Sequence, residues 1–284
     1  MGAILTAQPR EFELNDEDFA RIRRLLKERS GIDVGAGKRM LVYGRLTRRL
    51  RALKLENFGD YLKLVDDPHS DESRSFLNAL TTNVTELFRE EHHFELLRER
   101  VIPEMVDAGA RRLRIWSAGC SLSDEPYSIG LTLALLPELC DWDIKILATD
   151  IDSEVLSQAS AGTYQVERIE KLSPQLKAFF GRGIGKNAGL ARVGPRVRNM
   201  ITFKQLNLHD DWPMHGPFDV IFCRNVIIYF DQPTRERLVR RYAELLRPGG
   251  YLCLGHSESP TAGKVASLKS CGRTAFVKSG EDAR

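Results

Sequence analysis

The spacing of apolar residues divides the chain into two regions of different character. Up to about residue 95 these residues recur at helical intervals, as Phe19, Ile22 and Leu26 do, three or four positions apart on one helix face. Asn15 stands before this run as a candidate N-cap, and Gly31 follows it as a stop signal. Further helical patterns cover about residues 38–53, 58–65 and 76–80. We therefore expect residues 1–95 to form an all-α N-terminal domain.

Beyond residue 112, short apolar runs alternate with helical patterns. The runs typical of buried strands cover about residues 113–118, 144–149, 201–206, 220–223 and 251–254, and helical patterns begin near residues 125, 154 and 234. Strands that alternate with helices predict an α/β fold, in which right-handed crossovers build a parallel sheet. The basic, glycine-rich segment Gly181–Gly194 interrupts the alternation. We therefore expect a second domain over residues 96–284 with a β-subdomain inserted at about 172–203.

The composition is that of an ordinary soluble protein, with 42% hydrophobic and 29% charged residues among 284. The N-terminus lacks a basic region followed by a sustained apolar stretch, so no signal peptide is expected. No run approaches the roughly 18 apolar residues that span a bilayer. These features predict a cytoplasmic protein.

Cysteine and histidine spacing gives no indication of a metal site. The five cysteines form no CxxC pair and have no histidine nearby at zinc-ligand spacing; they are Cys120, Cys140, Cys223, Cys253 and Cys271. Reduced thiols in buried strands are the simplest interpretation. His92 and His93 are adjacent, so on a helix we expect them to point in different directions and to serve structure.

Charge is distributed unevenly, although the net charge is only +3. The predicted helix at residues 38–54 carries seven cations and no acid: Lys38, Arg39, Arg45, Arg48, Arg49, Arg51 and Lys54. We expect its arginines to lie on an exposed face, opposite Leu46, Leu50 and Leu53. Such a face fits an acidic protein partner, the phosphates of a nucleic acid, or a solvated surface without a partner.

Polar residues of special interest follow the predicted strands. They are the loop Gly119–Glu125, Asp150, Asn207, and the pair Arg224 and Asn225. Ligands of open α/β sheets bind at the carboxyl ends of the strands, and a carboxylate after the second strand suits a ribose diol. The loop is neither GxGxxG nor a P-loop. The acids Asp124 and Glu125 would suit a cationic cofactor without phosphates, such as S-adenosylmethionine, but could equally cap the following helix.

Several segments, in order, resemble the chemotaxis receptor methyltransferase (CheR-type) family. They are TTNVTELFREEHHF at 81–94, WSAGCS at 116–121, EPYSI at 125–129, ATDID at 148–152, FDVIFCRNVIIYF at 218–230, PGG at 248–250 and GHSE at 255–258. The resemblance implies an all-α domain followed by a class I, Rossmann-like S-adenosylmethionine-dependent methyltransferase sheet with a small antiparallel β-subdomain. It also implies transfer of a methyl group to glutamate carboxylates of methyl-accepting chemotaxis receptors, which yields S-adenosylhomocysteine and requires no metal.

The same resemblance implies roles for individual residues. The cofactor contacts would be Asn83, Thr85, Arg89, Glu125, Asp150, Asn207, Leu208, Arg224 and Asn225. As catalytic residues, Arg89 could hold either the substrate carboxylate or the cofactor carboxylate, and Tyr229 could donate its hydroxyl to the attacking glutamate. The exposed arginines of the basic helix would face the receptor: Arg45, Arg48, Arg49 and Arg51. His256 and Glu258 stand at a rim position and could touch the substrate. Docking of a receptor's C-terminal pentapeptide on the β-subdomain is a further expectation, with a monomer working beside membrane receptor arrays and no nucleic acid as partner.

Two positions depart from the family pattern. Ser123 stands where a glycine is usual, so a side chain is added where the backbone approaches the cofactor, and a positive φ is disfavoured there. Leu87 stands where an aromatic residue is usual.

Two other functions remain open from the residues alone. A nucleic-acid methyltransferase would use the basic helix, although residues 225–229 lack the Asn/Asp-Pro-Pro-aromatic run that amino-methylating enzymes often carry. A sensor or scaffold that binds the cofactor without turnover is the other. For glutamate methylation no general base is needed, because a carboxyl group with a pKa near ~4.3 is already ionised at neutral pH.

Overall fold

A computed structural model describes residues 11–280, which fall into two compact units divided between Thr81 and Thr82. We call residues 11–81 the helical unit and residues 82–280 the sheet unit. Residues 1–10 and 281–284 of the predicted domains lie outside the described residues. The division falls earlier than the boundary at residue 95 that the helical pattern predicts.

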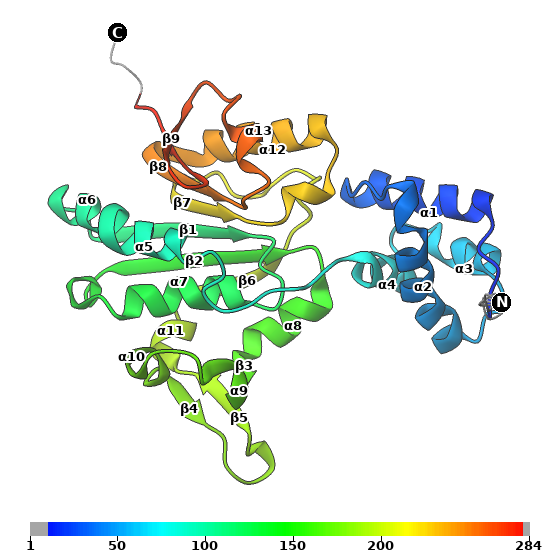
Figure 1. Ribbon diagram of the computed structural model, residues 1–284, viewed down its shortest axis with the longest axis horizontal. Helices are drawn as coiled ribbons and strands as arrows, with labels where there is room; N and C mark the ends of the chain where they lie inside the picture. Colours follow the sequence, from blue (N-terminus) through cyan, green and yellow to red (C-terminus); the bar gives the residue numbers. More distant parts are fainter. Residues whose placement is uncertain (1–10, 281–284) are drawn as a thin grey trace, which may run out of the picture. The chain divides into compact units, whose positions relative to one another are not determined.

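The helical unit contains the helices that the apolar spacing predicts (Figure 1). Its elements are α1 (Asp16–Ser30), the 3₁₀ turn η1 (Ala36–Lys38), α2 (Arg39–Leu53), α3 (Phe58–Val65) and α4 (Asp71–Leu80). Asn15 caps α1, since its side chain accepts a hydrogen bond from the Asp18 amide at 2.7 Å. Gly31 ends the helix with φ 74°, the left-handed conformation that glycine adopts without strain. Both capping predictions are confirmed.

The core of the helical unit is formed by the apolar faces of these helices. Ile22, Leu26, Leu46 and Leu50 are completely buried. Leu53 was expected on the same buried face as Leu46 and Leu50, but it is 37% exposed at the last position of α2. This prediction was wrong because the helix reaches the edge of the core one turn before it ends.

The sheet unit contains a seven-stranded sheet in the order β6-β2-β1-β7-β8-β10-β9. Its strands are β1 (Arg112–Ala118), β2 (Asp143–Asp150), β6 (Ile201–Gln205), β7 (Phe218–Cys223), β8 (Leu246–Leu254), β9 (Leu268–Gly272) and β10 (Ala275–Lys278). The strands from β6 to β8 pair in parallel, whereas β10 runs antiparallel to both of its neighbours. The order reverses at β1, which places the ligand side at the carboxyl end of that strand.

Helices cover both faces of this sheet, so its central strands are buried throughout. The crossover helices are α7 (Asp124–Ala134), α8 (Ser153–Ala161) and α12 (Gln232–Leu245), and all six residues of β7 are buried. Near-continuous apolar strands are typical of parallel sheets covered on both faces. Successive residues of β1 point to opposite faces: Ile115 joins the larger core, while Trp116 packs edge-on against Tyr242 of α12 with ring centroids 5.3 Å apart.

The helical stretch before β1 belongs to the sheet unit. It consists of α5 (His92–Leu96), the π-helical turn η2 (Leu97–Val101) and α6 (Ile102–Asp107). Phe94 stacks on Phe222 of β7, with centroids 6.1 Å apart. A helical pattern alone cannot assign a helix to one core or another, which explains why the predicted boundary falls later than the observed division.

A second, three-stranded antiparallel sheet forms the inserted β-subdomain. Its order is β3 (Thr163–Gln165), β5 (Leu190–Val193), β4 (Phe180–Arg182). The subdomain also contains the single turns α9 (Val166–Ile169), α10 (Pro174–Lys177) and α11 (Pro195–Arg198), and in Figure 1 it projects from the sheet unit on the side away from β8 and β9. The insertion begins about residue 163, earlier than the predicted 172, because the short strand β3 and the turn α9 precede it. Its predicted end at 203 overlaps β6, which belongs to the main sheet.

Among residues 11–280, no helix combines the length and the apolar character needed to cross a membrane.

Candidate functional site

The loop between β1 and α7 forms the floor of the candidate site. Gly119 has φ 80°, and its amide donates to the Thr149 carbonyl at 2.8 Å, which ties the end of β1 to the end of β2. A Cβ at Gly119 would lie 2.4 Å from Cγ2 of Val226, in the loop after β7. Only glycine therefore fits here, because the backbone needs a positive φ and the neighbouring loop leaves no space.

Asp150, at the carboxyl end of β2, is held by two backbone amides. Its carboxylate accepts from Ser121 at 2.8 Å and from Asp152 at 2.9 Å, and the side chain is mostly buried. Burial raises the pKa of Asp150, and the two amides partly offset that rise. A carboxylate held at this edge of the sheet fits the expected contact with a ribose diol.

Asn83 joins the segment before α5 to the same corner. Its amide nitrogen donates to Asp152 at 2.9 Å, and its carbonyl oxygen accepts from the Ser121 hydroxyl at 3.2 Å. Asn83 thus contacts Ser121 and Asp152, the two residues whose backbone amides hold Asp150. Ser121 was not singled out from the sequence, because its function lies in a backbone amide and a hydroxyl that no spacing rule identifies.

Glu125 and Arg224 form the polar centre of the site. Glu125 Oε1 accepts from the Ser117 hydroxyl at 2.7 Å, and Oε2 lies 3.3 Å from Nη1 of Arg224. Burial raises the pKa of Glu125, while the Arg224 guanidinium favours the ionised form. The pair joins the end of β7 to the first turn of α7, so two of the predicted site residues lie in contact.

Arg224 also holds the segment that carries Arg89. Its guanidinium donates to the Arg89 carbonyl and lies 3.7 Å from Glu90, over the ring of Phe94 at 5.6 Å. The Arg89 side chain is half-buried and donates to the Val84 carbonyl at 3.2 Å. Arg89 is thus positioned through its own backbone, while its side chain folds over the neighbouring turn.

Asp124 does not share the environment of Glu125. It is completely buried and pairs with Arg168 of α9 at 2.8 Å. Burial raises the pKa of Asp124, and the Arg168 guanidinium and the Thr85 hydroxyl oppose that rise. The idea that both acids receive a cationic cofactor group is therefore corrected: Asp124 anchors the β-subdomain, and Glu125 alone is directed at the site. Thr85 lies beside this anchor.

The loop after β7 is held by Glu258. This buried carboxylate accepts from the amides of Gly255 at 2.6 Å, Asn225 at 2.9 Å and Val226 at 2.8 Å. Asn225 has φ 59°, a conformation that an asparagine tolerates better than most residues. The expectation that Glu258 touches a substrate at the rim was wrong, because its oxygens are used by the backbone; His256 is exposed. Tyr229 follows in the 3₁₀ turn η5 (Ile227–Tyr229) and is half-buried.

Asn207 and Leu208 lie just past β6, as predicted. The Asn207 side chain accepts from the His209 amide at 3.1 Å, and Leu208 is buried. The amide of the preceding Leu206 donates to the Asp150 carbonyl at 2.9 Å. The expected adenine side therefore adjoins the expected ribose carboxylate.

His92 and His93 do not diverge as expected. Both imidazoles contact the Thr274 hydroxyl, at 3.0 and 2.8 Å, and their rings lie 4.1 Å apart. With Glu90 they bring possible ligand atoms within 4.8 Å of one another. Burial and the nearby Arg224 lower the pKa of His93 to about 2, so its imidazole is neutral; the Arg224 guanidinium would nevertheless repel a cation bound here. We therefore retain the structural role: the pair ties α5 to the β9–β10 turn.

The arginines of α2 do not share one exposed face. Arg45 donates to the carbonyls of Leu80 and Thr81 at 2.7 and 2.6 Å, and Arg49 pairs with Glu72 at 2.6 Å. Arg51 pairs with Glu11, and Arg48 is exposed. The prediction of a common solvent-facing row was wrong for Arg45 and Arg49, because acids and carbonyls distant in sequence fold against them.

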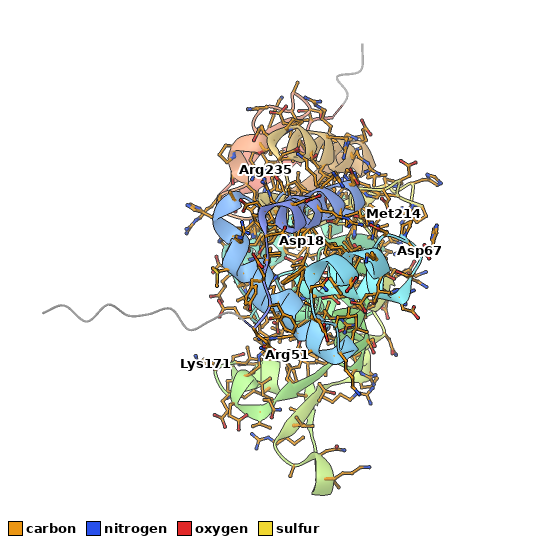
Figure 2. All side chains as sticks on the ribbon, turned by 90° about the vertical axis from the view of Figure 1, so that its right-hand side faces the viewer. Asp18, Arg51, Asp67, Lys171, Met214 and Arg235 are labelled. Carbon is orange, nitrogen blue, oxygen red and sulfur yellow. The ribbon has the colours of Figure 1, made fainter. Side chains whose placement is uncertain are left out.

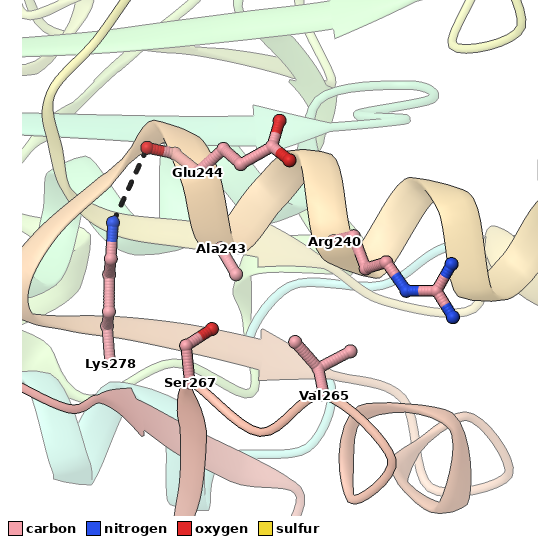
Figure 3. Close-up of a pocket in the computed structure, with 6 residues that line it drawn as sticks. All are labelled: Arg240, Ala243, Glu244, Val265, Ser267 and Lys278. Atoms are coloured by element: carbon pink, nitrogen blue, oxygen red, sulfur yellow. Dashed lines mark hydrogen bonds between the residues drawn. The ribbon is translucent and has the colours of Figure 1, made fainter.

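A separate cavity lies far from these groups. Figure 3 shows it between α12 and the segment that leads into β9, lined by Arg240, Ala243, Glu244, Val265, Ser267 and Lys278. The Lys278 amine donates to the carbonyls of Glu244 at 3.5 Å and Leu246 at 2.7 Å. Leu246 begins β8 whereas Asp150 ends β2, so Lys278 lies at the end of the sheet opposite the carboxyl ends of the parallel strands, and its amine caps the end of α12.

The described residues fit S-adenosylmethionine better than a dinucleotide. Two carboxylates and several hydroxyl and amide groups converge beside a tight glycine turn, whereas the loop offers no phosphate-binding sequence. Asp150 would hold the ribose and Glu125 would lie near the amino group of the methionine part.

Comparison with known proteins gives an independent result. Residues 17–81 match the family described as "CheR methyltransferase, all-alpha domain", and residues 83–276 match "CheR methyltransferase, SAM binding domain". The chain is 45% identical over 261 residues to a chemotaxis protein methyltransferase of Klebsiella aerogenes, covering 91% of this chain and 88% of that protein. It is 47% identical over 251 residues to chemotaxis protein methyltransferase 2 of Pseudomonas aeruginosa, with 88% and 89% covered. The Escherichia coli chemotaxis protein methyltransferase is 44% identical over 263 residues, with 90% and 89% covered.

Proposed function

The chain belongs to the CheR methyltransferase family, and from this premise we propose how its residues bind the cofactor, the receptor and the attacking carboxylate. The protein is an S-adenosylmethionine-dependent enzyme that esterifies glutamate side chains of chemotaxis receptors. The observation that supports the residue assignments is the placement of two carboxylates around the carboxyl end of β1. Asp150, at the end of β2, is held by the Ser121 amide of the β1–α7 loop, and Glu125, in the first turn of α7, is held by the Ser117 hydroxyl of β1. Nothing in the reaction calls for a metal.

When bound, S-adenosylmethionine supplies an electrophilic methyl group on a sulfonium. A receptor glutamate carboxylate would accept this methyl group as an ester, with S-adenosylhomocysteine as the product. The residues of this chain therefore need to orient rather than to remove a proton, since the carboxylate is already ionised at neutral pH. Water must also be kept from the methyl group. The buried rings of Phe94 and Phe222 give this side of the site an apolar wall that helps to exclude it.

Arg89 and Tyr229 are the residues we assign to the attacking carboxylate. Arg89 stands on a segment fixed by Arg224, and Tyr229 stands on a turn fixed by Glu258 through the Ile228 amide at 3.2 Å. A strong ion pair stabilises the ionised ground state more than a transition state that is losing charge. Orientation by these two groups, and not charge neutralisation, is therefore the expected gain.

Receptor docking on α2 is proposed to depend on Arg48, with a smaller part for Arg51. Arg48 is exposed on the same face as Met40, Leu41 and Gly44, which gives a mixed apolar and basic strip. A Cβ at Gly44 would meet nothing within 4 Å, so another helix can approach closely there. Glutamate-rich receptor helices complement this strip. Arg45 and Arg49 support it from within the helical unit.

The β-subdomain is proposed to hold a receptor's C-terminal pentapeptide. Strand β4 is at the edge of the three-stranded sheet, and the turn beyond it carries Ile184, 86% exposed, between Arg182 and Lys186. An extended peptide with a terminal carboxylate can add to such an edge and meet these cations. Tethering would raise the effective concentration of enzyme at the receptor without new contacts at the site.

We place this monomeric enzyme in the cytoplasm, beside receptor arrays.

Methyl-labelled S-adenosylmethionine tests these assignments. Receptor membranes should take up label, whereas DNA and RNA should not; label on nucleic acid alone would reject the proposal. Receptors that lack their C-terminal tail should be methylated more slowly at low receptor concentration, and equal rates would reject the tether.

A matched pair of variants tests the docking strip. Arg48→Glu should raise the KM for receptor while the melting temperature and the Kd for S-adenosylmethionine stay unchanged. Arg49→Gln should instead lower the melting temperature, because it leaves the half-buried Glu72 without its partner. An unchanged KM in Arg48→Glu would remove α2 from the receptor interface.

A further inference from the structure

Helix α12 carries arginines that reach out to two separate loops of the site. It begins directly after η5, with Asp231 as its N-cap, and runs back along the sheet to the start of β8. Arg235 lies in its first turns and Arg241 near its end. The hydrogen bonds of both side chains go to carbonyl groups outside the helix.

Arg241 fixes the loop after β6. Its guanidinium donates to the carbonyls of Leu208 at 3.2 Å and Asp210 at 2.9 Å, and it stacks on Trp212 with only 3.7 Å to the ring centroid. Trp212 in turn stacks on Tyr242, with centroids 5.2 Å apart and the planes at 23°. One planar fork thus holds two carbonyls and one ring of the same loop, a geometry that a lysine cannot reproduce.

The loop that Arg241 fixes includes Leu208 and follows Asn207, the residues assigned to the adenine side. The guanidinium is partly desolvated by Trp212 and the loop, so its hydrogen bonds are stronger than at an exposed position. Arg237, one turn earlier on the helix, contacts the ring of His209 at 3.2 Å. Side chains of α12 therefore contact three consecutive residues of the loop after β6, which we call the adenine loop: Leu208, His209 and Asp210.

Arg235, labelled in Figure 2, fixes a different loop. Its side chain donates to the Phe230 carbonyl at 2.7 Å and to the Ile228 carbonyl at 2.9 Å. The Ile228 carbonyl belongs to the peptide group just before Tyr229, and the Phe230 carbonyl belongs to the peptide group after the next residue, so α12 holds the backbone on both sides of Tyr229. Arg235 therefore fixes the backbone from which the Tyr229 side chain extends.

We propose that Arg235 and Arg241 are positioning residues with separate effects, Arg235 on turnover through Tyr229 and Arg241 on cofactor affinity through the adenine loop. The inference rests on the proposed roles of Tyr229 and of Asn207 and Leu208. One rigid helix then sets the distance between the two ends of the reaction site.

The test compares Arg235→Gln, Arg241→Gln and the control Arg240→Gln in the full chain. Arg240 is on the same helix, with a side chain 62% exposed and paired only loosely with Glu236 at 3.7 Å. Arg241→Gln should raise the Kd for S-adenosylmethionine about tenfold and leave kcat at saturating cofactor unchanged, since two hydrogen bonds are lost. Arg235→Gln should lower kcat about tenfold and leave that Kd unchanged. The control should match the wild type in both.

Two outcomes would overturn the inference: both variants change Kd and kcat together, or both lower only the melting temperature. Should Arg241→Gln fold poorly, Arg241→Lys keeps the charge but not the fork, and it should still weaken cofactor binding. Tyr229→Phe separates the inference from the proposed function. If it turns over normally while Arg235→Gln is slow, the role of Tyr229 fails and the positioning effect stands. If it is slow while Arg235→Gln is normal, the positioning effect fails.

Discussion

Arg224 Nη1 lies 3.3 Å from Glu125 Oε2, in a part of the sheet unit where the two side chains are only 3% and 12% exposed. The pair links the end of β7 to the start of α7. Because a second acid, Glu90, lies 3.7 Å from the same guanidinium, one cation balances two carboxylates. The site is thus organised around a buried charge that supports both the cofactor pocket and the Arg89 segment.

Replacing Arg224 by methionine should lower the free energy of unfolding by about 3–5 kcal/mol, because two buried carboxylates lose their counter-charge. Urea unfolding followed by circular dichroism measures this. Arg224→Lys, which keeps the charge but loses the fork, should lose less. If Arg224→Met unfolds at the same urea concentration as the wild type, the pair does not hold the site together.

Cofactor affinity should depend on pH through Asp150. Burial raises the pKa of this carboxyl above the ordinary value of 3.8 in the free protein, and ribose hydroxyls bind the ionised form. Lowering the pH protonates the free protein, so affinity should fall on acidification, starting above the pH at which an ordinary aspartate titrates. Calorimetry between pH 7.5 and 5 checks this.

Asp150→Asn is the control for the pH profile. This variant should bind S-adenosylmethionine more weakly at neutral pH, and its Kd should change less with pH. Any pH dependence that remains is assigned to Glu125, whose pKa burial also raises. If the wild-type Kd for S-adenosylmethionine were the same from pH 7.5 to pH 5, the proposal that an ionised Asp150 binds the ribose would be contradicted.

Gly119→Ala should abolish cofactor binding. It introduces a left-handed strain of about 1–2 kcal/mol and a Cβ at 2.4 Å from Val226, which must move together with Asn225. Gly109→Ala is a matched control, since Gly109 also has a positive φ, 71°, but has open space around it. This variant should lose stability through backbone strain alone, without a clash. The double variant Gly119→Ala, Val226→Ala should recover part of the binding. No recovery would mean that the clash is not the cause.

Ser123→Gly should stabilise the protein. Ser123 has φ 79°, and this strain is relieved by glycine, with a gain of about 1 kcal/mol and a rise of about 2–4 °C in melting temperature. The serine hydroxyl donates to the Leu122 carbonyl and lies 3.5 Å from the Tyr164 oxygen, and the loss of these contacts offsets only part of the gain. Differential scanning calorimetry decides, and a lower melting temperature would show that the hydroxyl matters more than the backbone.

The sequence predicted the features of the fold that depend on residues near one another in the chain, such as helix ends and buried strands. Asn15 and Gly31 mark the ends of α1 because capping involves only the nearest residues, and the apolar runs locate the parallel strands because those strands are buried on both faces. Ser123 is different: the sequence indicates that serine disfavours a positive φ there, yet the residue has φ 79°.

Long-range contacts account for the failures. The sequence cannot tell that Phe94 packs on Phe222, which assigns α5 to the sheet unit, nor that Arg168 reaches Asp124 across 44 positions. Arg49 meets Glu72, and His93 meets Thr274, for the same reason. The functions of these residues depend on partners that only the folded chain brings together.

The most direct test of receptor glutamate methylation is the chemical lability of the transferred methyl group. Purified enzyme, methyl-labelled S-adenosylmethionine and receptor membranes are incubated, and the isolated receptor is treated with mild base. Release of the label as methanol, lost in receptors whose methylated glutamates are changed to alanine, is the predicted result because a carboxyl ester hydrolyses in base. Label that stays on the receptor through base treatment would indicate an N- or S-methyl product and contradict the account.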